Sequence, residues 1–342
     1  MTAVIGHDAA IADFLSAMHG LRMHHAWLMA GPEGVGKASA ATALAKRLLC
    51  EAAGPELPDN GLDVPESHSI GKLVDAHTHP DFILLDRLPK DMKALREVER
   101  RDWPADVERA RNITVDQVRA LGATFALMPS YSRSRVVLVD SIDDMERSAA
   151  NALLKSLEEP PQGTIFLLVS HAPGRLLPTI RSRCRTLRFG ALDDHAMRTA
   201  LRRSLPDIGD AELAALVTAG EGAPGRALGL AGLDLASMDA CLQGLAHHGD
   251  PDNAVRAELA QSLSAKAVQR RYEAFLGRAP AFIAQEARSR QGAALAAAIN
   301  AWSAARALAE GAIRQSLDPQ MTVFALAGYV AGLAPGAKHV KA

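Results

Sequence analysis

The glycine-rich segment "GPEGVGK" constrains the fold more than any other feature of the sequence. Gly31, Gly36 and Lys37 have the Gly-x4-Gly-Lys spacing of a phosphate-binding loop. The loop follows "AWLMA" (26–30), which predicts a strand, and precedes "KASAATALAKRLL" (37–49), which predicts a helix. There, backbone N–H groups and the helix N-terminus can bind phosphate, and the lysine can reach the outer phosphates. A glycine-rich turn without a ligand is the alternative.

Further short apolar runs predict the sheet that carries this loop. Most are continuous rather than alternating, which is typical of parallel strands buried on both faces. Helical patterns lie between them, and one begins after Thr114, a good N-cap. Strands that alternate with helices predict an α/β domain with right-handed crossovers. The other predicted strands span 81–85, 135–139, 164–170 and 185–189, and the helices between them span 114–127 and 148–159.

Strand signals end after Phe189, which sets the expected domain boundaries. We predict a P-loop domain over 1–189, a small helical domain over 190–234 and an all-helical domain over 235–342. The polar stretch 51–112 differs from its surroundings. It carries Pro and Gly early and the charge-dense "KALREVERRDW" later, and predicts loops around one strand.

Composition excludes several classes of protein. The 342 residues carry a net charge of −1, so bulk attraction to nucleic acid is not expected. Cys50, Cys184 and Cys241 lie too far apart for a disulfide framework or a zinc motif. The first residues lack a signal peptide's basic region, and "MTVFALAGYVAGLA" is too short to span a bilayer comfortably. We therefore expect a cytoplasmic protein that does not enter membranes.

Two departures from active P-loop enzymes concern the chemistry. Ala38 stands where a Ser or Thr hydroxyl normally holds Mg²⁺. Asp140 ends an apolar strand, as the metal-binding Asp of P-loop enzymes does, but Ser141 cannot act as a general base. Asp143 and Asp144 are best explained as acids in a helix N-terminal turn. The pattern predicts a site that kept its fold and lost hydrolysis, while nucleotide binding stays open.

Several motifs resemble the clamp-loader branch of the AAA+ ATPases. These are "ANALLKSLEEPP" (150–161), Ser182-Arg183-Cys184, "GAPGRAL" (222–228) and the opening "VIGHDAAIADFLSAM". The resemblance covers roughly the first 230 residues, while the last hundred match only in being helical. It implies an AAA+ domain with a helical lid and a helical collar. The Ala38 and Ser141 departures favour the non-hydrolysing delta-prime type over the tau/gamma motor type.

The resemblance implies roles for particular residues. Arg183 would be an arginine finger that acts in trans on a neighbour's ATP, whereas spacing alone favours a solvated basic face. Ser170 would be a sensor-1 residue or only a strand-end hydroxyl. Arg226 would contact nucleotide or pair at a domain interface. The implied nucleotide-binding positions, some of them vestigial, are Gly31, Gly34, Gly36, Lys37, Ala38, Asp140, Ser170 and Arg226.

The same resemblance implies cofactors and partners. ATP or ADP would bind without hydrolysis. Zinc would be absent, because only Cys50 occupies the region of the family's zinc module and the downstream histidines are poorly spaced. The partners would be the tau/gamma motor subunit, the delta subunit, the sliding clamp and primer–template DNA. An active P-loop ATPase using a water or Asp143, and an unrelated nucleotide-binding module, are the alternatives.

Overall fold

The chain forms two compact units. The computed structural model describes residues 4–20, 23–54, 57, 61–92, 107–131 and 133–335. Contacts group Met1–Thr199 with Gly222–Gly225 in one unit, and Ala200–Glu221 with Arg226–Ala342 in the other. The charge-dense segment 93–103 lies outside the described residues. The predicted division of the helical part into two domains stays a prediction.

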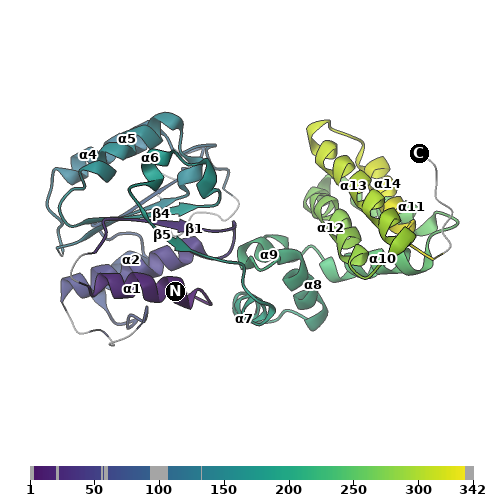
Figure 1. Ribbon diagram of the computed structural model, residues 1–342, viewed down its shortest axis with the longest axis horizontal. Coiled ribbons are helices and arrows are strands. Elements are labelled where there is room, and N and C mark those ends of the chain that lie inside the picture. The colour runs from purple at the N-terminus through teal and green to yellow at the C-terminus, as the bar shows by residue number, and fades with distance from the viewer. Residues whose placement is uncertain are drawn as a thin grey trace. The chain divides into compact units, whose positions relative to one another are not determined.

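A five-stranded parallel sheet organises the first unit (Figure 1). The strand order is β2-β3-β4-β1-β5, and every neighbouring pair is parallel. The predicted strands agree with the observed ones to within one residue at each end, and the α/β P-loop fold is confirmed. The strands are β1 (Ala26–Ala30), β2 (Phe82–Asp86), β3 (Arg135–Asp140), β4 (Thr164–Ser170) and β5 (Arg185–Arg188).

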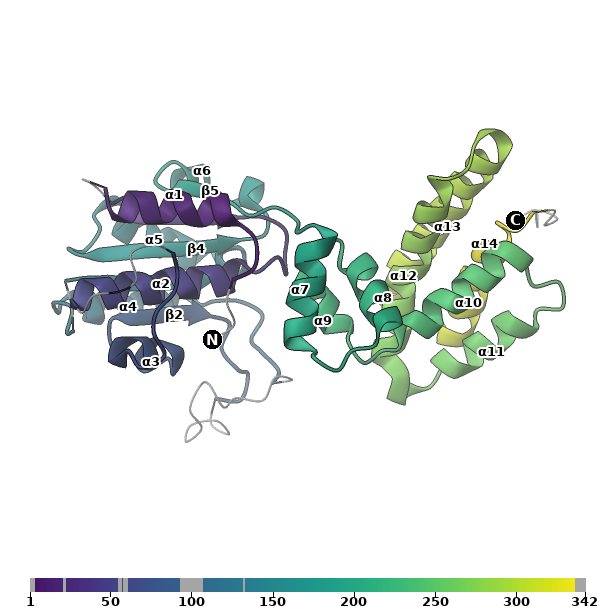
Figure 2. The ribbon, with the colours of Figure 1, turned by 90° about the horizontal axis from the view of Figure 1, so that it is seen from below.

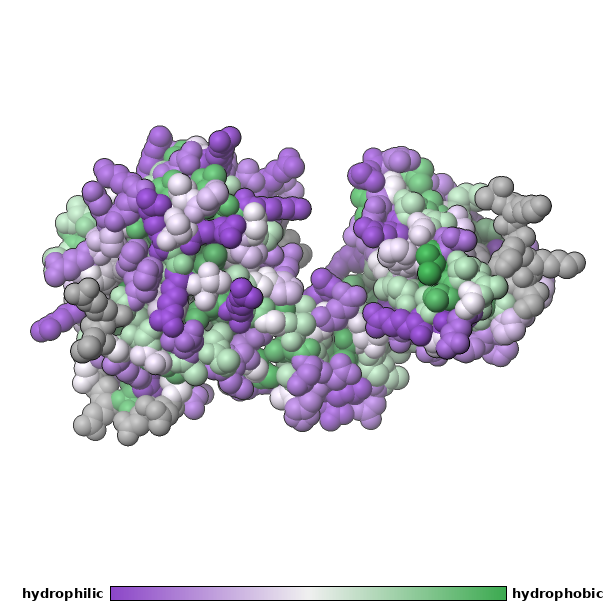
Figure 3. All heavy atoms as spheres, in the orientation of Figure 1, coloured by the Kyte–Doolittle hydropathy of each residue, from purple (hydrophilic) through white to green (hydrophobic). Residues whose placement is uncertain are grey.

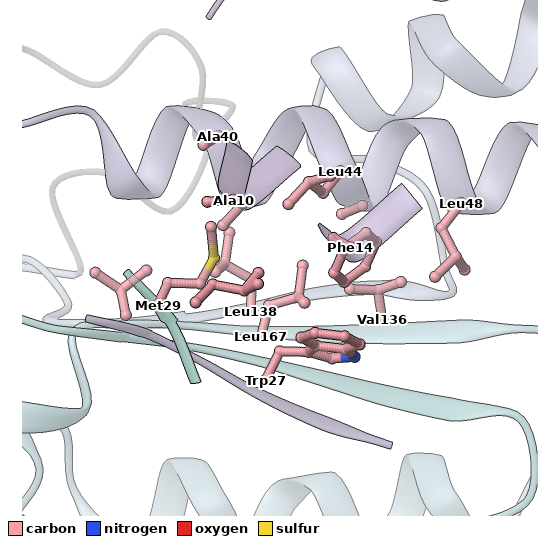
Figure 4. Packing of buried hydrophobic residues seen from close by; sticks show 14 of the residues in the cluster. Ala10, Phe14, Trp27, Met29, Ala40, Leu44, Leu48, Val136, Leu138 and Leu167 are labelled. Atoms are coloured by element: carbon pink, nitrogen blue, oxygen red, sulfur yellow. The ribbon is translucent and has the colours of Figure 1, made fainter. Parts of the chain in front are cut away.

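Helices cover both faces of this sheet (Figures 1 and 2). Trp27 and Met29 of β1 belong to one apolar cluster, while Leu28 and Ala30 belong to the other, as the two-residue period of a strand requires. In the first cluster the rings of Phe14 and Trp27 lie 5.0 Å apart (Figure 4). The first face carries α1 (Asp8–Met18), α2 (Lys37–Ala53) and α3 (Ser69–Asp75); the second carries α4 (Val115–Phe125), α5 (Arg147–Glu158) and α6 (Pro178–Arg181).

Local sequence explains most of these helix ends. The backbone N–H of Thr114 donates to the Gln117 side chain at 3.0 Å, in the capping box that begins α4. Prolines follow the end of α5 at 160–161. The short helix α3 lies where the polar sequence of 51–112 predicts loops, so that prediction is wrong at this point. Its N-cap is His68, whose ring accepts from Gly71 N, and histidine is not a usual capping residue.

The second unit is helical. Helix α14 (Pro319–Ala331) contacts each of the four other long helices of its bundle. Val323, Leu326 and Val330 of α14 are fully buried, and the helix is apolar nearly all round, as a central helix must be. Figure 3 shows hydrophilic groups over much of the visible surface of both units. The remaining helices are α7 (Asp194–Ser204) and α9 (Pro224–Leu230), both shared between the units, and α8 (Asp210–Gly220), α10 (Leu235–His248), α11 (Ala254–Leu263), α12 (Gln269–Ala287) and α13 (Gly292–Arg314).

Candidate nucleotide site and arginine finger

The phosphate-binding loop connects β1 to α2 in the predicted way. Gly31 is required because a Cβ there would lie 2.0 Å from the carbonyl oxygen of Phe189. Gly36 precedes the helix with φ of 103°, in the left-handed region that favours glycine. Gly34, also at positive φ, accepts a hydrogen bond from the backbone N–H of Gly225 at 2.8 Å. The loop therefore has a defined shape that these glycines permit.

Lys37 is buried at the first position of α2 and bends back over the loop. Its Nζ donates to the carbonyl oxygens of Gly31, at 2.7 Å, and of Pro32. Burial lowers the pKa of Lys37 below its usual value, and the nearby carboxylates of Asp143 and Asp140 partly oppose this shift. The ammonium is thus placed to exchange loop carbonyls for phosphate oxygens.

Residue 38 has no side-chain oxygen that could bind a metal. Ala38 has only a methyl group, and the hydroxyl of Thr42, one turn later, donates to the Ala38 carbonyl at 2.9 Å. Ser39 is exposed and lies about 100° further round the helix. The side chains at the start of α2 therefore do not replace the missing Ser or Thr.

Asp140 ends β3 beside Asp86 of β2. Burial raises the pKa of Asp140 above its usual value, Asp86 adds to the rise, and His171 opposes it. Ser141 follows, and its hydroxyl donates to Asp144 at 3.2 Å. The acidic residue of the pattern is therefore present, while the position of a general base carries a hydroxyl engaged within its own turn.

Asp143 has a structural role that its neighbours in the sequence do not indicate. It lies in the short helix η2 (Ile142–Asp144), and its carboxylate accepts from the Ser170 hydroxyl at 3.1 Å. It also accepts from the backbone N–H of His171 at 2.7 Å and of Ala172 at 3.1 Å. Asp143 thus holds the end of β4 and pairs with the Ser170 hydroxyl, while the sensor-1 role of Ser170 stays a prediction.

The opening segment lies against the loop. His7 Nε2 donates to the Val35 carbonyl at 2.9 Å, and the His7 ring lies 4.8 Å from the ring of Phe189. Gly6 and His7 both have positive φ, which turns the chain toward the loop before α1 begins. The structure therefore brings residues 6–7, 31–37, 140 and 170 to one end of the sheet, where β1, β3 and β4 finish.

Arg183 lies at the opposite end of the sheet, where the strands begin. In the parallel pair β1–β5, Trp27 stands beside Arg185 and Ala30 beside Arg188. Arg183 precedes β5, whereas the phosphate-binding loop follows the end of β1, so the two belong to opposite ends of the sheet. Arg183 does not belong to the loop's own site.

A match to a protein-family model identifies the family of this chain, and the match covers the whole sheet of the first unit. The family model described as "DNA polymerase III, delta subunit" matches residues 6–193. The chain belongs to this family. All five strands and the loop lie within the matched range, as does the "SRC" motif at 182–184.

The similar proteins include DNA polymerase III subunits of both the delta' and the tau type. The chain is 36% identical to the Pseudomonas aeruginosa subunit delta' over 61% of this chain and 56% of that protein. It is 30% identical to the Escherichia coli subunit tau over 69% of this chain and 33% of that protein. The match thus spans little more than half the length of the first relative and a third of the second.

A solved structure is also similar in fold. The gamma subunit-related protein of Thermotoga maritima aligns over 95% of this chain and 99% of that chain, with a TM-score of 0.44 and 16% identity. The family assignment rests on the sequence match.

Arg226 lies in the second unit. It is the other arginine for which the sequence predicts a functional role. Its guanidinium forms an ion pair with Glu221 at 2.5 Å, and its side chain is about half exposed (48%). Nothing in this contact separates a nucleotide-binding role from an interface role, and both stay predictions.

Cys50 and the histidines that follow it lie where the family's zinc module is expected. Cys50 is buried, and burial raises the pKa of its thiol to about 11. His68 caps α3, and His79 Nδ1 accepts from Asp81 N at 3.0 Å. Among the described residues, no three His, Cys, Asp or Glu side chains are arranged to hold a metal. In the same part of the chain, no helix is both long and apolar enough to cross a membrane.

Proposed function

We propose that this chain is the delta-prime-like, non-hydrolysing subunit of a DNA polymerase III clamp loader. The observation that carries the proposal is a phosphate-binding loop of intact shape beside two altered positions: Ala38 at the start of α2, where a metal ligand is expected, and Ser141 after β3, where a general base is expected. The ammonium of Lys37 and the loop's N–H groups support binding of ATP or ADP. The missing hydroxyl and general base argue against its hydrolysis.

Arg183 supplies the chain's catalytic contribution in this proposal. A guanidinium has a permanent charge and a planar set of donors that suits a phosphate. Arg183 lies at the end of the sheet opposite the phosphate-binding loop of the same chain. This position supports a role on the ATP of a neighbouring subunit rather than on a nucleotide bound to this chain. The neighbour would be a tau/gamma-type motor subunit, in a cytoplasmic assembly with the delta subunit, the sliding clamp and primer–template DNA.

An active ATPase, the second possibility from the sequence, lacks a supporting observation. It would need Asp143 or a water to replace the general base. The Asp143 carboxylate already accepts three hydrogen bonds from the end of β4. Using it as a base would compete with those bonds.

The decisive experiment measures ATP binding and turnover by the purified chain. We expect binding without turnover above background, and no turnover by the Ala38→Thr variant, since Ser141 still supplies no base. Lys37→Ala should weaken binding by about tenfold or more, because a charge-assisted bond to phosphate contributes about 1.5–3 kcal/mol. Turnover by wild type at the rate of an ordinary AAA+ motor would refute the proposal.

A further inference from the structure

Arg183 is held by its own chain through three contacts. Its Nη2 lies 2.7 Å from Glu158 Oε1. Its Nη1 donates to the Thr179 carbonyl at 2.9 Å and to the Ser182 hydroxyl at 3.3 Å. These contacts engage both terminal nitrogens of the guanidinium, including donors that would otherwise face a phosphate.

Glu158 is in an unfavourable place for an acid. It is the last residue of α5, and Glu159 is the C-cap. Carboxylates at a helix C-terminus oppose the helix dipole by about 0.3–1 kcal/mol. The positive charge of Arg183 offsets this cost for Glu158, so the placement makes sense as half of a pair. Glu159 is exposed at the neighbouring position.

The pair is weak enough to open. The Arg183 side chain is 34% exposed and that of Glu158 is 49% exposed. Pairs this exposed contribute about 0–1 kcal/mol and are screened by salt. A triphosphate carries more charge than one carboxylate, so a neighbour's nucleotide can compete for the same guanidinium.

Resting on the function proposed above, we propose that Glu158 restrains Arg183 in cis and that the arginine must leave this carboxylate to reach a neighbour's nucleotide. Glu158 then does not touch the reacting atoms. It sets the fraction of time during which Arg183 is free to act, and so the rate of the neighbouring site.

A first test uses the isolated full-length chain and needs no partner. Phenylglyoxal modifies accessible guanidines, and peptide mass spectrometry can follow Arg183 beside exposed Arg181 as an internal reference. In Glu158→Gln, the modification rate of Arg183 relative to Arg181 should rise by about two- to fivefold, the range that a pair of up to 1 kcal/mol allows. The rise should shrink at high salt. Glu159→Gln removes a neighbouring carboxylate from the same helix end and should leave the ratio unchanged.

A second variant separates restraint from general loosening. Ser182→Ala removes one uncharged contact, so its smaller effect should not depend on salt. An unchanged ratio in Glu158→Gln, or an equal rise in Glu159→Gln, would overturn the restraint.

The second test uses the reconstituted assembly with its motor subunits. Single-turnover ATP hydrolysis at the site facing Arg183 should be faster with Glu158→Gln, again by about two- to fivefold. Slower hydrolysis would show that Glu158 orients the arginine instead, and would refute the restraint. Arg183→Ala tests the proposed function separately, because unchanged hydrolysis in that variant refutes the finger itself. The phenylglyoxal result stands apart from that outcome.

Discussion

At the scale of single residues, the site departs from the pattern of active P-loop enzymes at two positions. The loop's glycines and Lys37 form the geometry that phosphate binding needs, and Ala38 and Ser141 remove one metal ligand and one base. The sequence shows both substitutions directly, because each stands at a fixed offset from a motif. It could not show that Asp143 is already bonded, since its partners Ser170 and His171 lie 27 and 28 residues away.

Asp140 gives a pH-dependent prediction. Its pKa is raised in the folded protein, chiefly by burial. Below about pH 4, the usual range for Asp, it is protonated folded or unfolded and contributes nothing. As the pH rises, the unfolded chain ionises first and is stabilised by water, so the folded state loses relative stability until the raised folded pKa is passed. Asp140→Asn should therefore be more stable than wild type at pH 7 and equal to it below pH 4.

Urea unfolding across that pH range measures the difference for Asp140. Asp116→Asn, at an exposed position on α4 (side chain 87% exposed), controls for the change in net charge. A wild type that is more stable than Asp140→Asn at pH 7 would contradict the stated role of burial.

At the scale of elements, the strands were predictable and one helix was not. Continuous apolar runs of this length, such as 164–170, predict buried strands, and the structure agrees. Helix α3 has seven residues and joins the core through Ile70 and Val74. Its last residue, Asp75, pairs with Lys46 of α2 at 2.6 Å, a contact that exists only after folding. Tertiary contacts, rather than local propensity, define this helix.

Asp143 gives a prediction at this scale, because it joins η2 to the end of β4. Asp143→Ala leaves one hydroxyl and two backbone N–H groups without their acceptor, and each lost partner costs about 1–3 kcal/mol when buried. We expect a loss of about 2 kcal/mol or more in the free energy of unfolding, measured in urea. Asp144→Ala, the matched control, removes the acceptor of one buried hydroxyl, that of Ser141, and an ion pair to the half-exposed Arg87, and should cost less than half as much. Equal losses would contradict the anchoring role.

At the scale of the whole molecule, the described residues of each unit have an apolar core of their own. In the first unit, one buried cluster lies on each face of the parallel sheet; in the second, the core is built around α14. The alternation of strands and helices predicted the first core, and the end of strand signals after Phe189 predicted a helical remainder. The contacts of α14 were not predictable, since its apolar pattern has no distinct face to indicate which helices surround it.

The two cores should respond independently to mutation. Leu138 on β3 and Leu326 on α14 are 1% and 0% exposed, and each Leu→Ala change should cost about 2–5 kcal/mol in its own unit. Hydrogen exchange followed by mass spectrometry should show faster exchange of the sheet with Leu138→Ala, and of α10–α14 with Leu326→Ala. Met321→Ala, at an exposed position on α14 (68%), should change neither by more than about 0.5 kcal/mol. If Leu326→Ala accelerated exchange equally in the sheet, the two units would unfold as one cooperative body, because only a shared transition carries a local loss of packing into the core of the other unit.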